Sequence, residues 1–180
     1  KINIENYLIK HSNKLQINSN NINKGDVFIA LKGSNTHGNQ YIDSALRNGA
    51  KFVVTDLKQK NFSNKKILLV KNNFDFLEKV AINKRSIFKG VVVAVTGSVG
   101  KTTIKEYLNF FLLSFGKISA SVKSYNNYLG VLVSLINFDK NSLFAILEVG
   151  TNNFYEIRKL AAIILPDQVI ISNINPTHLK

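Results

Sequence analysis

The chain has 180 residues, of which 45% are hydrophobic, 19% are charged and none is cysteine. A chain of this length can bury a hydrophobic core, and without cysteine it has neither a disulfide framework nor a thiolate metal site. No apolar run reaches the roughly 20 residues that span a membrane, and the N-terminal stretch lacks the apolar core and cleavage site of a secretory signal. We therefore expect a cytoplasmic, globular protein without a membrane span.

The formal net charge of +13 raises the question of nucleic-acid binding. The basic residues are almost all lysines, and arginine occurs only as Arg47, Arg85 and Arg158. The densest basic stretch, residues 56–66, contains a single aromatic residue, Phe62. Because sequence readers and phosphate clamps favour the arginine fork, we expect no nucleic-acid partner, although a positive surface would attract small anionic substrates.

The first half of the sequence predicts a small α/β unit. Short runs rich in β-branched residues are typical of strands, and segments with helical spacing accompany them. The expected strands are residues 26–31, 51–56 and 65–71, and the expected helices are residues 40–49 and 73–88. We predict a domain boundary after residue 88, so that residues 1–88 form an N-terminal domain and residues 89–180 belong to a second one.

The second half changes to alternating strands and helices. Residues 91–95, 144–149 and 168–172 are continuous apolar runs, as expected of parallel strands buried on both faces. This alternation predicts an α/β fold with a doubly wound parallel sheet. One apolar stripe is expected on the helix that follows the first of these strands, and it consists of Ile104, Tyr107, Leu108, Phe111, Leu112 and Phe115.

A glycine-rich loop, TGSVGKTT, connects the strand at residues 91–95 to that helix. Gly97 and Gly100 allow backbone conformations in which successive N–H groups point at an anion, and the helix directs its positive end to the same place. Lys101 can reach the β- and γ-phosphates of a nucleotide, and the hydroxyl of Thr102 suits a Mg²⁺ ligand. The alternative is a glycine-rich turn that binds no ligand.

This loop is a shortened variant of the usual phosphate loop. The pattern G-x-x-x-x-G-K-[ST] would require glycine at the position of Val95. A strand precedes the loop and a helix follows it, which is the context that a phosphate loop needs. We expect the whole loop to hold the phosphates of ATP, through Thr96, Gly97, Ser98, Val99, Gly100, Lys101, Thr102 and Thr103.

Further site residues are expected where neighbouring parallel strands end, because ligands sit beyond the carboxyl ends of such strands. Glu148 lies near the end of the strand at residues 144–149, where a carboxylate is costly without a cation, and it can coordinate Mg²⁺. His178 follows the third strand, but it can equally be a solvated bystander. Asn126 and Asn127 precede an apolar segment and can equally form a turn and a helix cap. The residues alone therefore predict a magnesium-dependent nucleoside-triphosphate site, but no substrate.

The motifs resemble, in order, those of the Mur ligase family, the ATP-dependent amide ligases of bacterial cell-wall synthesis. The loop TGSVGKTT is similar to that family's shortened phosphate loop, and SYNNYLGV, LEVGTNNFYEI and SNINPTHL follow at fitting spacings. Residues 22–56 are similar to the family's N-terminal uridine-nucleotide-binding domain. The resemblance covers nearly the whole chain.

Within the family, the resemblance favours one activity. Ser98, residues 104–106 and the stretch EVGTN at residues 148–152 favour the member that adds D-alanyl-D-alanine to UDP-N-acetylmuramoyl-tripeptide. That reaction proceeds through an acyl phosphate and uses ATP and Mg²⁺. The resemblance therefore implies these two substrates as the partners of the protein.

The resemblance also implies roles for individual residues. Lys101 would bind the β- and γ-phosphates, Thr102 the first Mg²⁺, and Glu148 and His178 the metal that bridges ATP and the carboxylate. Lys101, Glu148 and His178 would thus be the catalytic residues. Asn127 is a further candidate for contact with ATP, where it would hold the transferring group.

The sequence departs from the family pattern near the expected uridine site. Asn18-Ser19-Asn20 stands where Asp-Ser-Arg is common, and His37-Gly38-Asn39 stands where Asp-Gly-His is usual. We expect Ser19, Lys32 and Gly33 to contact the UDP moiety, and the two departures leave the details of UDP binding open.

Length is the larger departure. The family continues beyond His178 to a lysine that helps to hold the second metal ion and to a C-terminal domain. We therefore expect an N-terminal domain followed by the first half of a P-loop-type ATPase domain, monomeric and inactive by itself. Two alternatives stay open, a non-catalytic module that holds nucleotide or UDP-sugar and a neighbouring Mur ligase that adds a single amino acid. Folylpolyglutamate synthase shares the phosphate loop, but it is not expected to carry the N-terminal segment.

Overall fold

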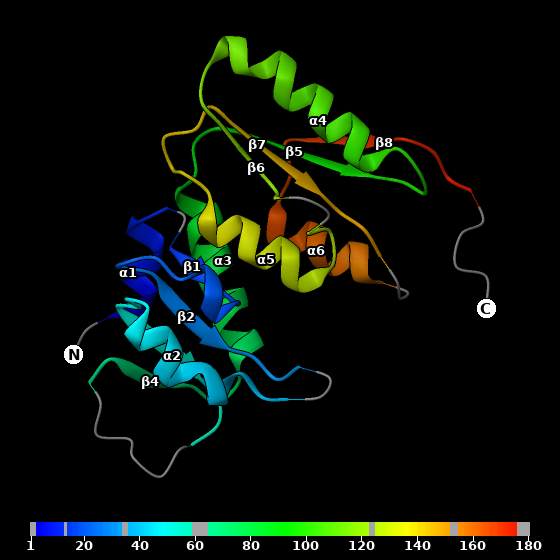
Figure 1. Cartoon of the computed structure of the whole chain (residues 1–180). Helices are drawn as coiled ribbons and strands as arrows, with labels where there is room; N and C mark the ends of the chain where they lie inside the picture. The colour runs from blue at the N-terminus through cyan, green and yellow to red at the C-terminus, as the bar shows by residue number, and fades with distance from the viewer. Residues whose placement is uncertain are drawn as a thin grey trace. The chain divides into compact units, whose positions relative to one another are not determined.

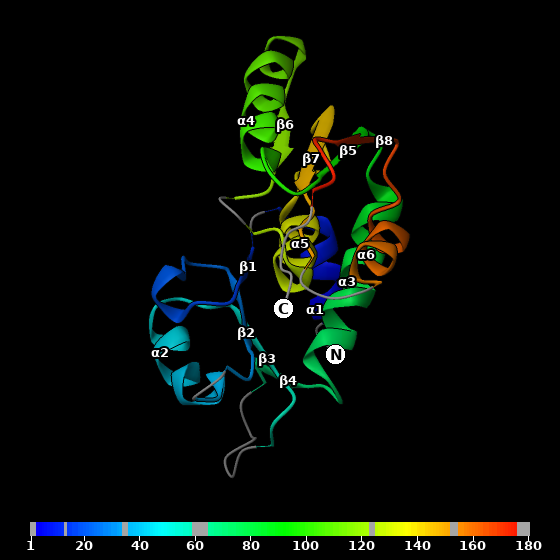
Figure 2. The same cartoon turned by 90° about the vertical axis from the view of Figure 1, so that its right-hand side faces the viewer.

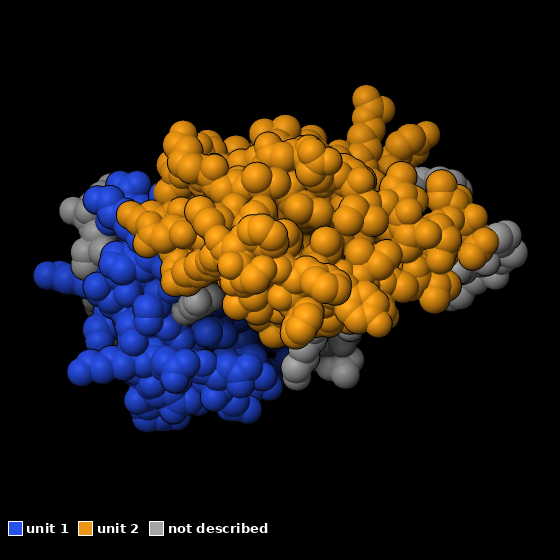
Figure 3. All heavy atoms as spheres, turned by 90° about the horizontal axis from the view of Figure 1, so that it is seen from above, with its two compact units in different colours: residues 1–80 blue, residues 81–180 orange. Residues whose placement is uncertain are grey.

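The computed structural model describes residues 3–12, 14–33, 36–58, 65–122, 125–151 and 155–175. The chain divides into two compact units, Lys1–Val80 and Ala81–Lys180 (Figure 3). Each unit contains its own four-stranded sheet, and the strands of both sheets are parallel. The α/β fold class predicted from the sequence is confirmed, whereas the predicted domain boundary after residue 88 stays a prediction.

The sheet of the first unit has the strand order β1-β2-β3-β4. Its strands are β1 (Leu15–Gln16), β2 (Val27–Ala30), β3 (Phe52–Thr55) and β4 (Ile67–Leu69). Every residue of β2 and β3 is buried, and this explains why the two strands appear in the sequence as continuous rather than alternating apolar runs. The two-residue strand β1 was not predicted, because it is too short to show a period.

The helical segments of this unit are short. They are α1 (Ile4–Lys10), α2 (Ile42–Arg47) and the 3₁₀ turns η1 (Ser19–Asn21) and η2 (Gly38–Tyr41). Ile42 and Ala45 of α2 join Phe28 of β2 and Val53 of β3 in one buried cluster. Helix α3 (Asn73–Ile87) follows β4 and contains the point at which the chain divides into the two units.

The sheet of the second unit has the strand order β6-β7-β5-β8. Its strands are β5 (Val91–Thr96), β6 (Ile118–Ala120), β7 (Phe144–Glu148) and β8 (Gln168–Ile171). Val95 of β5 pairs in register with Glu148 of β7, and Thr96 pairs with Ile171 of β8. The segments that follow these three strands therefore start side by side at one edge of the sheet.

Helices cover both faces of this sheet (Figures 1 and 2). Helix α4 (Lys101–Leu112), which continues into the 3₁₀ turn η3 (Leu113–Phe115), lies on one face. Helices α5 (Tyr128–Asn137) and α6 (Glu156–Ile164) lie on the other. Helices on both faces agree with the doubly wound arrangement predicted from the sequence. Of the helices described, none is long and apolar enough to cross a membrane.

The apolar stripe predicted for α4 is only half right. Ile104, Leu108 and Leu112 pack against a buried cluster of sheet residues, Val93, Val95 and Ile146. The prediction was wrong for a second row of side chains, because the sheet contacts only one narrow i, i+4 row of the helix. The residues of that second row are 63%, 65% and 70% exposed, and they are Tyr107, Phe111 and Phe115.

Candidate functional site

The glycine-rich loop runs from the end of β5 to the start of α4. Gly97 and Gly100 have φ angles of +131° and +84°, a backbone region that favours glycine. At Gly97 space is limiting as well, because an added Cβ would lie 2.9 Å from the carbonyl oxygen of Asn173. Gly100 is the N-cap of α4 and supplies no side-chain cap. The loop thus needs both glycines for its path, and it leaves the start of the helix uncapped.

The first backbone N–H groups of α4 are available to a ligand. In the described part of the chain, no hydrogen bond is donated by the N–H groups of Gly100, Lys101, Thr102 or Thr103, whereas the N–H group of Ile104 donates to the Gly100 carbonyl at 3.0 Å. Uncapped N–H groups at a helix start favour an anion, because they carry the positive end of the helix dipole.

A cavity of about 420 Å³ lies beside these N–H groups. Its volume falls within the range of small-molecule sites. It brings together six consecutive loop and helix residues with two side chains from elsewhere in the second unit. The lining residues are Ser98, Val99, Gly100, Lys101, Thr102, Thr103, Asn126 and Glu148.

Lys101 folds back over the loop. Its Nζ donates to the carbonyl oxygens of Gly97 at 2.6 Å and of Ser98 at 3.2 Å. The side chain lines the 420 Å³ cavity and also a second cavity that borders the loop. Contact with a phosphate would require the ammonium group to exchange one or both carbonyls for phosphate oxygens.

Glu148 is the buried carboxylate of the site, with an exposed fraction of 1%. Its Oε2 accepts a hydrogen bond from Oγ1 of Thr102 at 2.9 Å, and its Oε1 accepts one from Nδ2 of Asn126 at 2.9 Å. Its backbone N–H donates to Oγ of Ser121 at 3.2 Å. Both side-chain donors are neutral, and among the described residues no ion pair is formed with this carboxylate. A buried carboxylate held in this way can accommodate a cation.

The two adjacent amides, Asn126 and Asn127, have different roles. The side chain of Asn127 accepts a hydrogen bond from the Gly130 N–H at 2.8 Å and caps α5, so its predicted contact with ATP stays a prediction. Asn126 is the amide that contacts Glu148. Sequence reasoning left a turn and helix cap open for both amides and placed only Asn127 in the site. The signal that could have found Asn126 is that only one of two neighbouring amides can cap a helix, which leaves the other free to turn toward the strand end.

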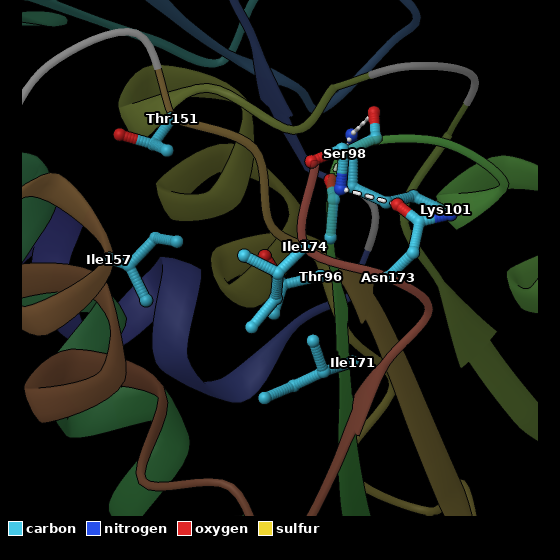
Figure 4. A pocket seen from close by; sticks show the side chains of 9 residues that line it. Thr96, Ser98, Lys101, Thr151, Ile157, Ile171, Asn173 and Ile174 are labelled. Atoms are coloured by element: carbon cyan, nitrogen blue, oxygen red, sulfur yellow. Dashed lines mark hydrogen bonds between the residues drawn. The ribbon is translucent and has the colours of Figure 1, made fainter. Parts of the chain in front are cut away.

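The second cavity, of about 370 Å³, is mostly apolar. Figure 4 shows Ile157 of α6, Ile171 of β8 and Ile174 around it, with Ser98 and Lys101 of the loop beside them. Its other lining residues are Thr96, Gly97, Thr151 and Asn173. The loop residues Ser98 and Lys101 therefore border both a polar cavity and an apolar one.

One predicted metal ligand, His178, lies outside the described residues. Within the described ranges, no group of three or more His, Cys, Asp or Glu side chains could hold a metal ion. The oxygen donors that the structure brings together are the hydroxyl of Thr102 and the carboxylate of Glu148. Both were predicted as metal ligands from the sequence, and their role in binding a metal stays a prediction.

The residues predicted to contact UDP lie in the first unit, beyond the carboxyl ends of the neighbouring strands β1 and β2. Ser19 is buried in η1, and its carbonyl accepts a hydrogen bond from Nδ2 of Asn48 at 3.1 Å. Lys32 forms an antiparallel bridge with His37, and the N–H group of Gly33 donates to the Thr36 carbonyl at 2.8 Å. The three residues share one edge of the sheet, and their contact with UDP stays a prediction.

The departures from the family pattern in this unit make internal contacts. Asn39 accepts a hydrogen bond from the hydroxyl of Thr55 at 2.5 Å and donates one to the Leu57 carbonyl at 3.0 Å. Nε2 of His37 lies 3.3 Å from a carboxylate oxygen of Asp56. These side chains therefore fix the end of β3 and the residues that follow it.

Comparison with protein families and with known sequences gives consistent matches. A family model described as "Mur ligase family, catalytic domain" matches residues 11–135, and one described as "Mur ligase middle domain" matches residues 95–180. A UDP-N-acetylmuramoyl-tripeptide–D-alanyl-D-alanine ligase from Rickettsia prowazekii is 42% identical over 169 residues, which are 93% of this chain and 37% of the relative. An enzyme of the same name from Synechocystis sp. is 32% identical over 168 residues, with the same two shares.

Solved structures give a similar result. The MurF ligase from Thermotoga maritima in complex with ADP matches with a TM-score of 0.81 and 35% identity, over 96% of this chain and 40% of that structure. MurF from Acinetobacter baumannii matches with a TM-score of 0.81 and 28% identity, over 92% of this chain and 36% of that structure. The chain thus spans two fifths or less of the length of each of these relatives.

Proposed function

Because the chain belongs to the Mur ligase family, we propose that it acts in an ATP-dependent ligase that joins D-alanyl-D-alanine to UDP-N-acetylmuramoyl-tripeptide, in the synthesis of peptidoglycan precursors. The names of the relatives from Rickettsia prowazekii and Synechocystis support this choice of substrates. We also propose that the protein is cytoplasmic and monomeric. The observation that carries the proposed function is the contact between Thr102 and Glu148 in the cavity beside the phosphate loop.

In this proposal the phosphate loop holds ATP. The unpaired N–H groups from Gly100 to Thr103 would donate to the phosphate oxygens, and Lys101 would turn from the loop carbonyls to the β- and γ-phosphates. The ADP in the Thermotoga maritima MurF structure supports the choice of an adenine nucleotide.

The residues of the cavity also fit a magnesium ion. Mg²⁺ prefers hard oxygen ligands and usually keeps several waters beside one or two carboxylates and phosphate oxygens. The hydroxyl of Thr102 and the carboxylate of Glu148 are oxygen ligands of this kind, and they already lie 2.9 Å apart. When bound, Mg²⁺ would neutralise charge on the phosphoryl group that is transferred. His178 is proposed as a further ligand.

The reaction needs positioning more than a protein nucleophile. A terminal carboxylate oxygen of the tripeptide attacks the γ-phosphorus of ATP, so that ADP leaves and an acyl phosphate forms. The amine of D-alanyl-D-alanine then attacks the acyl carbon, and the tetrahedral intermediate collapses to the amide and inorganic phosphate. We assign the chain's own residues to holding the phosphates in line, with Lys101 on the anionic oxygens and Glu148 fixing the hydroxyl of Thr102.

Phosphate release from ATP by the full-length protein tests the proposal. Release should require both UDP-N-acetylmuramoyl-tripeptide and D-alanyl-D-alanine. Release with a single amino acid in place of the dipeptide would identify a neighbouring Mur ligase instead. Nucleotide binding without release under any of these conditions would identify a non-catalytic binding module.

A further inference from the structure

The segment that follows β8, residues 172–175, lies against Ser98 and Val99, which we call the outer arm of the phosphate loop. Oγ of Ser172 donates to the Val99 carbonyl at 2.5 Å. Oγ of Ser98 donates to the Asn175 carbonyl at 2.9 Å and accepts from the Asn175 N–H at 2.8 Å. The two segments are more than 70 residues apart in the chain, so these bonds tie the loop to a distant part of the second unit.

The side chain of Asn173 makes the densest set of these contacts. Its Oδ1 accepts hydrogen bonds from the N–H groups of Ser98 at 3.1 Å and Val99 at 2.9 Å. Its Nδ2 donates to the Val99 carbonyl at 3.2 Å. One amide thus pairs with both the N–H and the carbonyl of Val99, which fixes the peptide planes on either side of that residue.

The lining of the two cavities shows that the amide of Asn173 does not occupy the polar one. Asn173 lines the apolar 370 Å³ cavity (Figure 4), and it is not among the residues that line the 420 Å³ cavity containing Thr102 and Glu148. The side chain therefore contacts the loop from outside the polar cavity. In this position it satisfies the two N–H groups of the outer arm and leaves those of the inner arm, from Gly100 to Thr103, for a ligand.

We propose that Asn173 is a positioning residue for the nucleotide. By holding the Val99 peptide, it keeps the N–H groups from Gly100 to Thr103 in the arrangement that phosphate oxygens require. This inference rests on the proposed function, because it presumes that the loop binds a nucleotide. Neither the length of the phosphate-loop motif nor its residue types point to Asn173, which lies in a different segment.

The opposite role would give the opposite effect. If the amide oxygen occupied the place of a phosphate oxygen, it would compete with the nucleotide, and its removal would tighten binding. If it positions the loop, its removal makes the loop less ordered and weakens nucleotide binding. The direction of the change in affinity therefore separates the two roles.

The test measures MgADP binding to the full-length protein by titration calorimetry. Asn173→Ala should weaken MgADP about tenfold, the effect of losing one or two hydrogen bonds. Asn175→Ala is the matched control, because Asn175 contacts Ser98 only through its backbone, and it should bind as the wild type does. The KM for ATP should rise by a similar factor, while kcat changes less than about threefold.

A second variant covers the case in which Asn173→Ala does not fold. Asn173→Asp keeps the shape of the side chain but loses the donor to the Val99 carbonyl, so it should also weaken MgADP. Asn175→Asp places the same charge nearby without touching the Val99 peptide, and it serves as its control. Unchanged or tighter binding by the Asn173 variants would overturn the positioning role. A wild-type protein that binds no MgADP would instead remove the proposed function on which this inference rests.

Discussion

The hydroxyl of Thr102 donates to a carboxylate oxygen of Glu148 across 2.9 Å, although the two residues are 46 positions apart in the chain. The contact joins the first turn of α4 to the end of β7, and the amide of Asn126 holds the other oxygen of the same carboxylate. Two side chains whose oxygen atoms can coordinate a metal are thus fixed beside the phosphate loop before any ligand arrives. Preorganisation of this kind lowers the cost of binding a metal nucleotide.

The carboxylate of Glu148 should couple nucleotide binding to Mg²⁺. Glu148→Gln keeps the size of the side chain and removes its charge, so we expect ADP affinity in the presence of Mg²⁺ to fall at least tenfold, while affinity without Mg²⁺ changes little. Calorimetric titration of ADP with and without Mg²⁺ measures both values. Glu106→Gln is the control, because that carboxylate lies on α4, is 60% exposed and pairs at 3.0 Å with the buried ammonium group of Lys105, outside the residues that line the cavity. Retained magnesium dependence in Glu148→Gln would remove Glu148 from the metal site.

Lys101 should matter more for turnover than for folding. Lys101→Ala removes the cation that is expected on the β- and γ-phosphates, and we expect ADP release by the full-length protein to fall at least about 100-fold. The hydrogen bonds to Gly97 and Ser98 are lost as well, but they lie within the loop, so the melting temperature should change little. Lys89→Ala, at an exposed lysine before β5, is the matched control. Turnover close to that of the control would contradict the assignment.

The two glycines of the loop should differ in their tolerance of alanine. Both have positive φ angles, and a strained backbone costs of order 1 kcal/mol at either position. Only Gly97 also lacks space, because its Cβ would approach Ser172 and the Asn173 carbonyl, whereas the nearest atom to a Cβ at Gly100 is 4.0 Å away. Gly97→Ala should therefore lower both the free energy of unfolding and the affinity for MgADP more than Gly100→Ala does. Denaturant unfolding and calorimetry compare the two variants, and equal losses would contradict the close approach of residues 172–173.

The stability of the chain should rise in mildly alkaline solution because of Lys84. Burial lowers the pKa of Lys84 from 10.5 to about 8. The charge of the Asp139 carboxylate acts in the opposite direction and offsets only part of this shift. Between these two pKa values the unfolded chain holds the proton and the folded chain has lost it, so the free energy of unfolding increases with pH in this window. Relative to Lys84→Met, the wild type should gain about 2 kcal/mol between pH 8 and pH 10.

Urea unfolding at several pH values measures this gain. Every other ionisable group is common to the wild type and the variant, so the difference between them isolates Lys84. Lys89→Met, at an exposed position, should show no such trend. A difference between wild type and Lys84→Met that does not change with pH would contradict the lowered pKa.

Features that depend on local sequence could be predicted. The strand before residue 96, the helix after residue 100 and the glycines between them form one continuous segment, so their order alone indicated a phosphate loop. Glu148 could be predicted because a charged residue near the end of a buried run is costly without a partner, and parallel strands bring their ends to one edge. The predicted membership of the Mur ligase family is confirmed by the match over residues 11–135.

Features that depend on contacts between distant segments could not be predicted. The contact between Asn126 and Glu148 spans 22 positions, and that between Asn173 and Val99 spans 74. Neither has a periodic signal, because both depend on how loops at the edge of the sheet are placed. The prediction that the second row of side chains packs against the sheet was wrong for a related reason. Helical spacing alone does not say how wide a face of the helix the sheet will cover.

The exposed aromatic row of α4 and η3 has a consequence for the behaviour of the chain in solution. Tyr107, Phe111 and Phe115 are each more than 60% exposed, and Phe110 beside them is 73% exposed. The formal net charge of +13 keeps molecules apart at low ionic strength. Added salt screens that repulsion and leaves the attraction between aromatic surfaces. We therefore expect the chain to stay dispersed in buffers of low ionic strength and to associate as salt is added.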